Sequence, residues 1–223
     1  ADETWRAVLA IDPAGRGGAG SDELAWAVVA ELNGSLYVLE SGGSVLGYDE
    51  RILDTLAKRA ARWNVSDVVV ERNWGGGMFT SILTPVMLKQ HRCSIEEITV
   101  TQQKERRICD VLAPLVQQHR LVFNADLIRK DYLEAERNND GGHERSLLFQ
   151  MSRITSERGA LSRDDRIDAL ALACQFFTEA AAQDQLVKAA ERDFELWQNQ
   201  IEMASDETGA SIDALAMGLP RKT

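Results

Sequence analysis

The sequence predicts an α/β protein with one mixed sheet, in which three antiparallel strands come first and parallel strands follow, flanked by helices. Three short apolar runs open the chain, and the dipeptide Asn33-Gly34 between the second and third is typical of a tight hairpin turn. From Asp49 onward, stretches with helical apolar spacing alternate with short β-rich runs. Helical crossovers between such runs favour parallel strand pairing.

The first strand is predicted over residues 5–11, because an apolar run rich in aliphatic residues ends there, before Pro13. Asp12 therefore follows this strand and opens a glycine-rich loop. Two further strands are predicted over residues 24–31 and 35–40, on either side of the hairpin turn. These three strands are expected to be antiparallel neighbours.

Helices and strands then alternate along the chain. The expected elements are a helix over 49–63, a strand over 66–71, a helix over 79–90, a strand over 98–101, a helix over 104–118, a strand over 121–123, a helix over 126–136 and a helix over 164–177, for which Ser162 is a candidate N-cap. Residues 146–155 fit either a strand or a helix, and residues 180–203 fit a separate last helix.

We expect three parts in the 223-residue chain. Residues 1–183 form the main domain, residues 184–204 a helical extension, and residues 205–223 a mobile tail of small and polar residues. The chain begins with Ala1 rather than Met, as expected of a processed product or a piece of a longer protein.

This order of elements is that of a ribonuclease H-like sheet, in which the first strand lies beside the strand that follows the first helix. Asp12 and Glu71 occupy corresponding ends of these two strands. If the strands are parallel neighbours, the two carboxylates lie about one strand spacing apart, ~5 Å.

A third acidic group is predicted at the start of the helix over 164–177. Asp165 and Asp168 are three residues apart, and Asp164 and Asp168 four apart, so either pair shares one helix face. Asp168 lies in an otherwise apolar stretch, where a charge usually has a partner. Acidic residues in a first helical turn also simply favour the helix dipole, and acids at strand ends are common.

Carboxylates that lie close together repel one another unless cations bind between them. The candidate ligands are all oxygens, which suit Mg²⁺ or Mn²⁺ rather than zinc. Two such ions can bind one phosphodiester, activate water and stabilise the leaving oxygen. The pattern therefore predicts a metal-dependent nuclease whose ligands are Asp12, Glu71, Asp168 and either Asp164 or Asp165.

Basic and glycine-rich segments add candidate phosphate contacts. Glycines surround Arg16 after the first strand, where backbone N–H groups could approach an anion, although a surface loop fits equally well. Cations at a helix start oppose the helix dipole unless they face an anion such as DNA phosphate, or simply lie in water. The candidate DNA-binding residues are Arg16, Arg72, Lys104, Arg106 and Arg107, and residues 74–79 are a candidate substrate loop.

Five ordered strings resemble the C-terminal nuclease domain of tailed-bacteriophage terminase large subunits. They are IDPAGRGG at 11–18, VERNWGGGMF at 70–79, QKERRI at 103–108, HRLVF at 119–123 and RGALSRDDRIDAL at 158–170. The resemblance implies a ribonuclease H-like endonuclease that cuts concatemeric double-stranded viral DNA during genome packaging. It also implies that Asp12 and Glu71 are the strand acids, and Asp165 and Asp168 the helix acids, that bind two Mg²⁺ or Mn²⁺ ions.

The same resemblance implies partners and a location. Double-stranded DNA, the terminase small subunit, the portal and an ATPase motor domain of the same protein are expected partners, in the cytoplasm of an infected host cell. This chain has no GxxxxGK[ST] phosphate loop, so we expect the motor to lie outside it.

Charge and composition limit the function classes. Thirty-five acidic and 25 basic residues give a net charge of −10, so we expect weak, metal-dependent and sequence-independent cutting by this piece alone. No apolar run is long enough to cross a bilayer, and the polar first residues do not form a secretory signal. Three widely spaced cysteines, Cys93, Cys109 and Cys174, predict buried reduced thiols in an intracellular protein rather than a disulfide or zinc framework.

Three other functions fit parts of the pattern. A Holliday-junction resolvase-like or transposase-like nuclease would share the acids, and would be distinguished by a preference for branched DNA. An actin-like ATPase fragment also begins with a strand and a glycine-rich loop, but needs a second similar half. A non-catalytic assembly module of the packaging machine would keep the fold without the reaction.

Overall fold

The computed structural model describes residues 5–13, 22–72, 77–137 and 142–208, and their side chains except at residues 137, 142 and 201–208. The chain divides into two compact units, Ala1–Phe177 and Thr178–Thr223, and each is described by itself. Among the described residues, no helix combines the length and the apolar character that a membrane crossing needs.

One six-stranded sheet forms the centre of the first unit, in the order β5-β4-β1-β2-β3-β6. Strand β1 pairs antiparallel with β2 and parallel with β4, β2 pairs antiparallel with β3, and β5 and β6 add in parallel at the two edges. The strands are β1 (Arg6–Asp12), β2 (Leu24–Leu32), β3 (Ser35–Ser44), β4 (Asp67–Glu71), β5 (Ser94–Ile98) and β6 (Leu121–Phe123). The predicted mixed sheet is confirmed.

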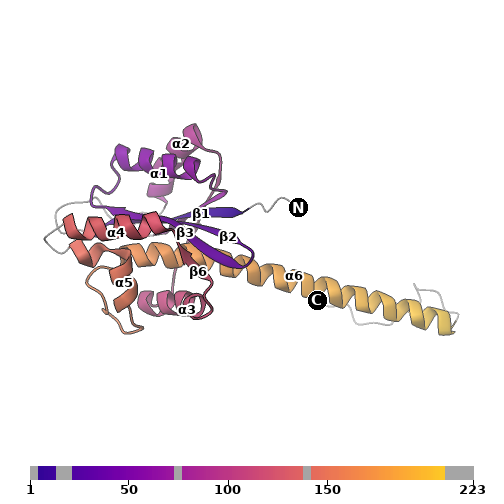
Figure 1. Ribbon diagram of the computed structural model, residues 1–223. Coiled ribbons are helices and arrows are strands. Elements are labelled where there is room, and N and C mark those ends of the chain that lie inside the picture. The colour runs from indigo at the N-terminus through magenta and orange to yellow at the C-terminus, as the bar shows by residue number, and fades with distance from the viewer. Residues whose placement is uncertain (1–4, 14–21, 73–76, 138–141, 209–223) are drawn as a thin grey trace. The chain divides into compact units, whose positions relative to one another are not determined.

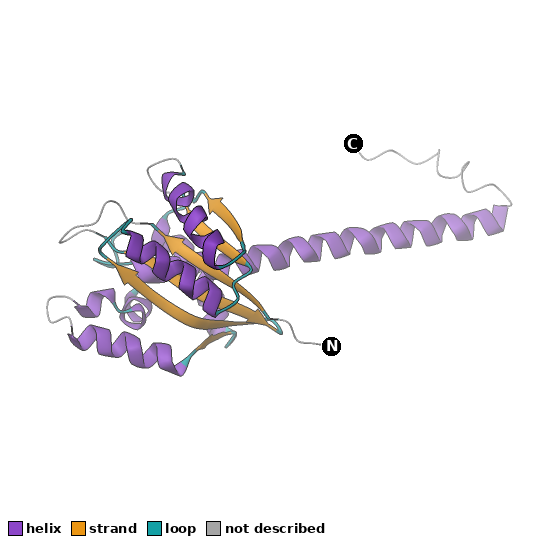
Figure 2. Ribbon diagram, turned by 90° about the horizontal axis from the view of Figure 1, so that it is seen from above, coloured by secondary structure: helices purple, strands orange, loops and turns teal. Residues whose placement is uncertain are grey.

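Helices cover both faces of the sheet (Figures 1 and 2). Helices α1 and α2 lie on one face, and α3, α5 and the first turns of α6 lie on the other. The helices are α1 (Glu50–Arg62), α2 (Met78–Gln90), α3 (Lys104–Gln117), α4 (Ala125–Arg137), the 3₁₀ turn η1 (Gly142–Arg145), α5 (Leu147–Arg153) and α6 (Asp165–Thr208).

Alternation along β1 divides the core into two layers. Val8 and Ala10 pack with residues 167–174 of α6, whereas Leu9 and Ile11 pack under α1 and α2. Because both faces of this strand are buried, its sequence is a continuous apolar run rather than an alternating one. The two layers hold β1 rigidly in the middle of the sheet, with Asp12 at its end.

Local turn and cap chemistry explains several element boundaries. Asn33 and Gly34 both have positive φ, 52° and 78°, which is the backbone that a type I′ hairpin turn requires. The Asp49 carboxylate accepts a hydrogen bond from the Arg51 N–H at 2.9 Å and caps α1. The predicted hairpin and the predicted first helix are confirmed.

The predicted strand over residues 98–101 is wrong in position. The strand is β5, Ser94–Ile98, which pairs with β4 from Asp67↔Ser94 to Glu71↔Ile98. As an edge strand, β5 has two exposed glutamates and only half-buried isoleucines, so its sequence lacks the apolar run of a central strand. Ile98 is therefore the last residue of the strand and not the first.

Two helical predictions are also corrected or decided. Residues 146–155 contain a helix, α5, and the Ser146 hydroxyl caps it by accepting from the Phe149 N–H at 3.2 Å. One helical element, α6, covers both the predicted helix at 164–177 and the predicted separate helix at 180–203. It begins at Asp165, so Ser162 lies too early to be its N-cap.

The three cysteines, Cys93, Cys109 and Cys174, are free as predicted, but only Cys174 is buried.

Candidate metal centre

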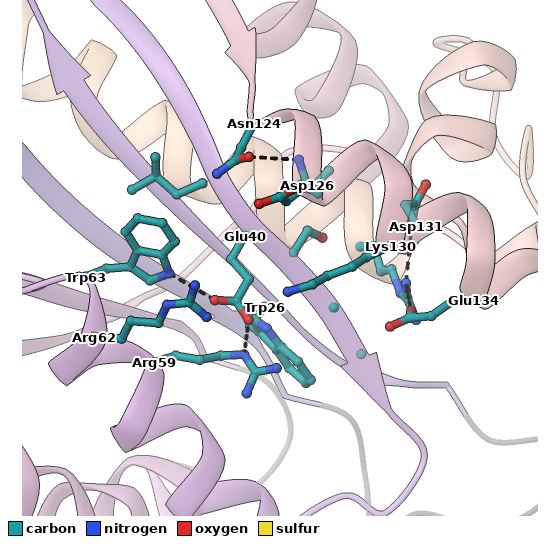
Figure 3. A pocket seen from close by; sticks show the side chains of 16 residues that line it. Trp26, Glu40, Arg59, Arg62, Trp63, Asn124, Asp126, Lys130, Asp131 and Glu134 are labelled. Atoms are coloured by element: carbon teal, nitrogen blue, oxygen red, sulfur yellow. Dashed lines mark hydrogen bonds and ion pairs between the residues drawn. The ribbon is translucent and has the colours of Figure 1, made fainter.

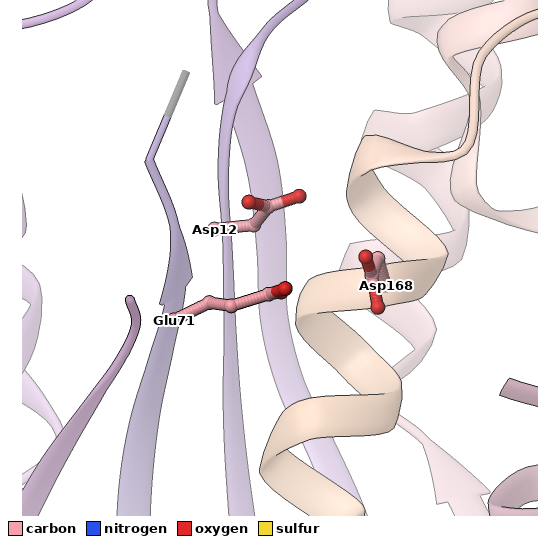
Figure 4. Close-up of side chains that lie close together, drawn as sticks. All are labelled: Asp12, Glu71 and Asp168. Carbon is pink, nitrogen blue, oxygen red and sulfur yellow. The ribbon is translucent and has the colours of Figure 1, made fainter. Parts of the chain in front are cut away.

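Two carboxylates meet at the ends of adjacent parallel strands. The register of β1 and β4 pairs Ile11 with Val70, so Asp12 and Glu71 are the next residues on the two strands. Figure 4 shows both side chains directed toward the first turn of α6, from which Asp168 approaches. Three segments that are far apart in the sequence therefore bring one carboxylate each to the same place.

These three acids form a compact group of oxygen ligands, which we call the acid group: Asp12, Glu71 and Asp168. One oxygen from each lies within 4.8 Å of the others. Asp12 and Asp168 are buried, and burial together with the Asp168 charge raises the pKa of Glu71 above its usual value. The buried Glu71 Oε2 has no hydrogen-bond partner among the described residues. This Glu71 oxygen is thus available to a further ligand.

Lys104, the first residue of α3, brings an ammonium group to these carboxylates. Its Nζ lies 2.9 Å from Asp168 Oδ2, 2.9 Å from Asp164 Oδ1 and 3.7 Å from Asp12 Oδ2. Burial disfavours the charge of Lys104, but the surrounding carboxylates outweigh that penalty, so the pKa of Lys104 is well above its usual value. Lys104 is therefore charged at any physiological pH.

Arg107 lies one helical turn further along α3 and reaches the other side of the acid group. Its Nη2 donates to Asp168 Oδ1 and lies 3.6 Å from Glu71 Oε2. The side chain is only 2% exposed. Residues three apart share a helix face, so the sequence spacing of Lys104 and Arg107 places both cations toward the acids.

The two remaining helix acids, Asp164 and Asp165, have different surroundings. Asp164 precedes the first helical residue of α6 and shares Lys104 with the acid group. The Asp165 Oδ2 instead accepts a hydrogen bond from the Glu23 N–H at 3.3 Å, and burial raises its pKa to about 6. The structure does not bring Asp165 into the acid group, which consists of three other residues among those described.

A second set of contacts fixes the first turn of α6 in place. The Gln150 Oε1 accepts from the Ile167 N–H at 2.9 Å, which satisfies one of the free N–H groups at the start of the helix. Arg166 bonds Glu23 at 3.2 Å and Glu134 at 2.9 Å. The sequence did not reveal these supports, because their partners are separated by 17 to 143 residues.

The predicted DNA-binding residues fall into three groups. Arg16 lies outside the described residues, as do the loop glycines at 15–20 and residues 74–76. Arg72 and Arg106 are exposed, and their nearest carboxylates are 3.7 and 3.8 Å away. Lys104 and Arg107 instead contact the acid group.

A hollow of about 270 Å³ lies beside β3, between α1 and α4 (Figure 3). Trp26, Arg59, Trp63 and Lys130 are among its lining residues, and none of the acid group is. It is therefore a separate feature of the fold and does not form part of the metal centre.

A mixed sheet with carboxylates at adjacent ends of two parallel strands, faced by a carboxylate from a helix, defines the class of ribonuclease H-like nuclease folds. Residues 11–121 match the family model described as Terminase Bacteriophage T7, Ribonuclease H-like domain. The match spans 111 of the 223 residues and includes Asp12, Glu71, Lys104 and Arg107.

One similar sequence and two similar solved structures agree with this match. The chain is 40% identical over 214 residues to the terminase large subunit of Enterobacteria phage T3, covering 95% of this chain and 36% of that protein. It therefore spans about a third of the relative's length. The human cytomegalovirus terminase nuclease domain has a similar fold, with a TM-score of 0.51 and 12% identity over 77% of this chain and 82% of that chain. A structure of the same viral domain, soaked with Mn and bound to an inhibitor, matches equally well, over 83% of its chain.

Proposed function

We propose that this chain is a metal-dependent endonuclease that cuts concatemeric double-stranded viral DNA during genome packaging. The observation that supports this most strongly is the acid group, formed where the ends of β1 and β4 meet the first turn of α6, in a chain that matches the family model over residues 11–121. The rest of the relative's length lies outside this chain, so an ATPase motor domain, the small subunit and the portal would supply grip and timing.

The residues of the acid group fit divalent ions. All the donors are carboxylate oxygens, which suit Mg²⁺ or Mn²⁺, and the buried Glu71 Oε2 has no hydrogen-bond partner among the described residues. A pair of such ions would lower the pKa of an attacking water and stabilise the leaving oxygen of a phosphodiester. Asp12, Glu71 and Asp168 would hold them.

The other polar residues would hold the ligands in place or contact the DNA. Arg107 holds Glu71 and Asp168 in place, because it contacts one oxygen of each. Asp165, which the sequence assigned as a ligand, would instead fix the start of α6 against the Glu23 backbone. Among the candidate DNA-binding residues, Arg72 and Arg106 have exposed side chains that would contact DNA phosphates, and Arg16 belongs to the same proposal.

A plasmid-nicking assay tests the proposed function. Supercoiled plasmid is incubated with the chain in Mn²⁺, in Mg²⁺ and in EDTA, and the experiment is repeated with Asp12→Asn. We expect nicked and linear products only with a divalent ion. The variant should be at least 100-fold slower because it loses one ligand charge, as typical losses from electrostatic catalytic groups indicate.

Four results would contradict the proposal. Cleavage that continues in EDTA, or that survives Asp12→Asn in a correctly folded protein, would exclude the acid group as its origin. A much faster cut of four-way junctions than of linear duplex would favour a resolvase-like activity instead. A folded chain without any cleavage would support an assembly role.

A further inference from the structure

Lys104 places one ammonium among three carboxylates from two segments, the end of β1 and the start of α6. Its Nζ is within 4 Å of Asp12 at the end of β1, Asp164 before α6 and Asp168 in the first turn of α6. A divalent ion held by the acid group would use the oxygens of Asp12 and Asp168 as well. The Lys104 ammonium and a bound metal ion would therefore contact the same carboxylates, those of Asp12 and Asp168.

The formal charge of the site depends on whether the Lys104 ammonium stays beside the carboxylates. Four carboxylates (Asp12, Glu71, Asp164 and Asp168) face two cations, Lys104 and Arg107, which leaves −2. One divalent ion balances that charge. Two divalent ions and one substrate phosphate reach neutrality only if the ammonium has left, because the sum is +1 while it remains.

The two cations differ in their freedom to leave. The Lys104 side chain is 37% exposed and carries its charge on a flexible stem, so it can turn into water. The Arg107 side chain is 2% exposed and has no such route. Lys104 is thus the exchangeable cation, and Arg107 the permanent one.

We propose that Lys104 is an internal competitor of the divalent ions: its ammonium occupies the oxygens of Asp12 and Asp168 and weakens the binding of the second ion. This inference rests on the proposed metal-dependent function and adds a residue that sets the metal concentration at which the centre is filled. In this proposal Lys104 controls metal binding through the acid group and does not act by contacting DNA.

Mn²⁺ titration followed by electron paramagnetic resonance tests the proposal, since the signal of free Mn²⁺ reports affinity and stoichiometry without any cleavage. Wild type is compared with Lys104→Met and Lys104→Gln, which remove the charge, and with Lys104→Arg, which retains it. Arg106→Met is the matched control, because it removes a charge two residues further along α3 on an exposed side chain.

We expect both neutral variants to tighten the weaker Mn²⁺ site about tenfold, since removing one nearby charge at a partly screened distance is worth that order of affinity. Lys104→Arg and Arg106→Met should stay within about twofold of wild type by the same estimate. The neutral variants should also melt at a lower temperature in EDTA and regain that loss in Mn²⁺, because a metal then replaces the missing charge.

The outcomes separate the two proposals. If wild type binds Mn²⁺ and both neutral variants bind it equally well or more weakly, Lys104 is no competitor, but the metal centre stands. If folded wild type binds no Mn²⁺, or if Asp12→Asn binds it as tightly as wild type, the proposed function itself fails.

Discussion

At the scale of single residues, Asp165 connects the metal centre to the stability of the fold. Burial raises its pKa to about 6, against about 3.9 in an unfolded chain. The folded state therefore binds a proton more tightly than the unfolded state. This group lowers the stability as the pH rises from about 4 through 6, and the full cost is present at pH 7.

Asp165→Asn should remove that cost. Asparagine retains an oxygen that can accept the Glu23 N–H, but it carries no charge to desolvate. We expect the variant to be more stable than wild type at pH 7, by on the order of 2 kcal/mol, and to match it near pH 4. Urea unfolding in EDTA across this pH range measures the difference. A variant that is less stable at pH 7 would show that the Asp165 charge is needed.

Arg107 provides the opposite case, a buried cation that the fold requires. Its removal leaves Glu71 and Asp168 close together without the guanidinium between them. Breaking one partner of a buried ion pair costs about 3 kcal/mol or more. We expect Arg107→Met to lose that much unfolding free energy in EDTA, whereas Arg106→Met on the same helix should be nearly neutral. Equal stability of the two variants would disprove the role assigned to Arg107.

The acids of the candidate metal centre are easier to predict from the sequence than the cations around them. Asp12 and Glu71 follow apolar strands, and Asp168 interrupts an apolar helix face, so each has a signal in its neighbouring residues. Lys104 and Arg107 carry no such signal, because the carboxylates they contact lie up to 92 residues away in the sequence. The sequence therefore predicted a DNA contact for this helix start, but not the contacts that Lys104 and Arg107 make with the acid group.

At the scale of elements, the strands were predictable where they are buried on both faces and less so at the edges. β1 and β4 are continuous apolar runs, but β5 is exposed and was placed too late in the chain. The end of β3 was also missed: the strand was expected to stop at residue 40 and runs to Ser44. The last residues of β3 were not predicted because they include Gly42 and Gly43. Glycine is unfavourable in strands unless a neighbouring group packs too closely for a side chain.

Gly42 in β3 has such a neighbour. A Cβ at this position would lie 2.5 Å from Cζ2 of the buried Trp26 indole. We expect Gly42→Ala to lower the free energy of unfolding by about 1–3 kcal/mol, because the tryptophan cannot move without disturbing the core. Thermal and urea unfolding measure this loss.

Ser41→Ala is the matched control for Gly42→Ala. The buried Ser41 hydroxyl oxygen has no hydrogen-bond partner among the described residues, so its removal should change stability by no more than about 0.5 kcal/mol. If Gly42→Ala is as mild as Ser41→Ala, the close approach of strand and indole does not limit this position.

At the scale of the whole molecule, the acidic charge is unevenly distributed. Residues 178–223 contain nine acidic and four basic residues, a net of −5, which is half of the −10 of the chain. DNA is a polyanion, so this portion repels it. The acid group and its supports lie within Ala1–Phe177, and the core cluster beside α6 ends at Phe177. Folding and the proposed cutting should therefore depend on the first unit.

A chain that ends at residue 183 tests this division. We expect it to unfold cooperatively within about 3 °C of the full chain, because no residue of either core cluster is removed. It should also nick plasmid in Mn²⁺ at least as fast at low salt, since it loses eight acidic and four basic residues. A chain that ends at residue 163 is the control: it lacks Asp168 and the buried residues 167–174, and should neither fold nor cut. Loss of both properties in the longer truncation would show that the predicted extension at 184–204 belongs to the folded nuclease.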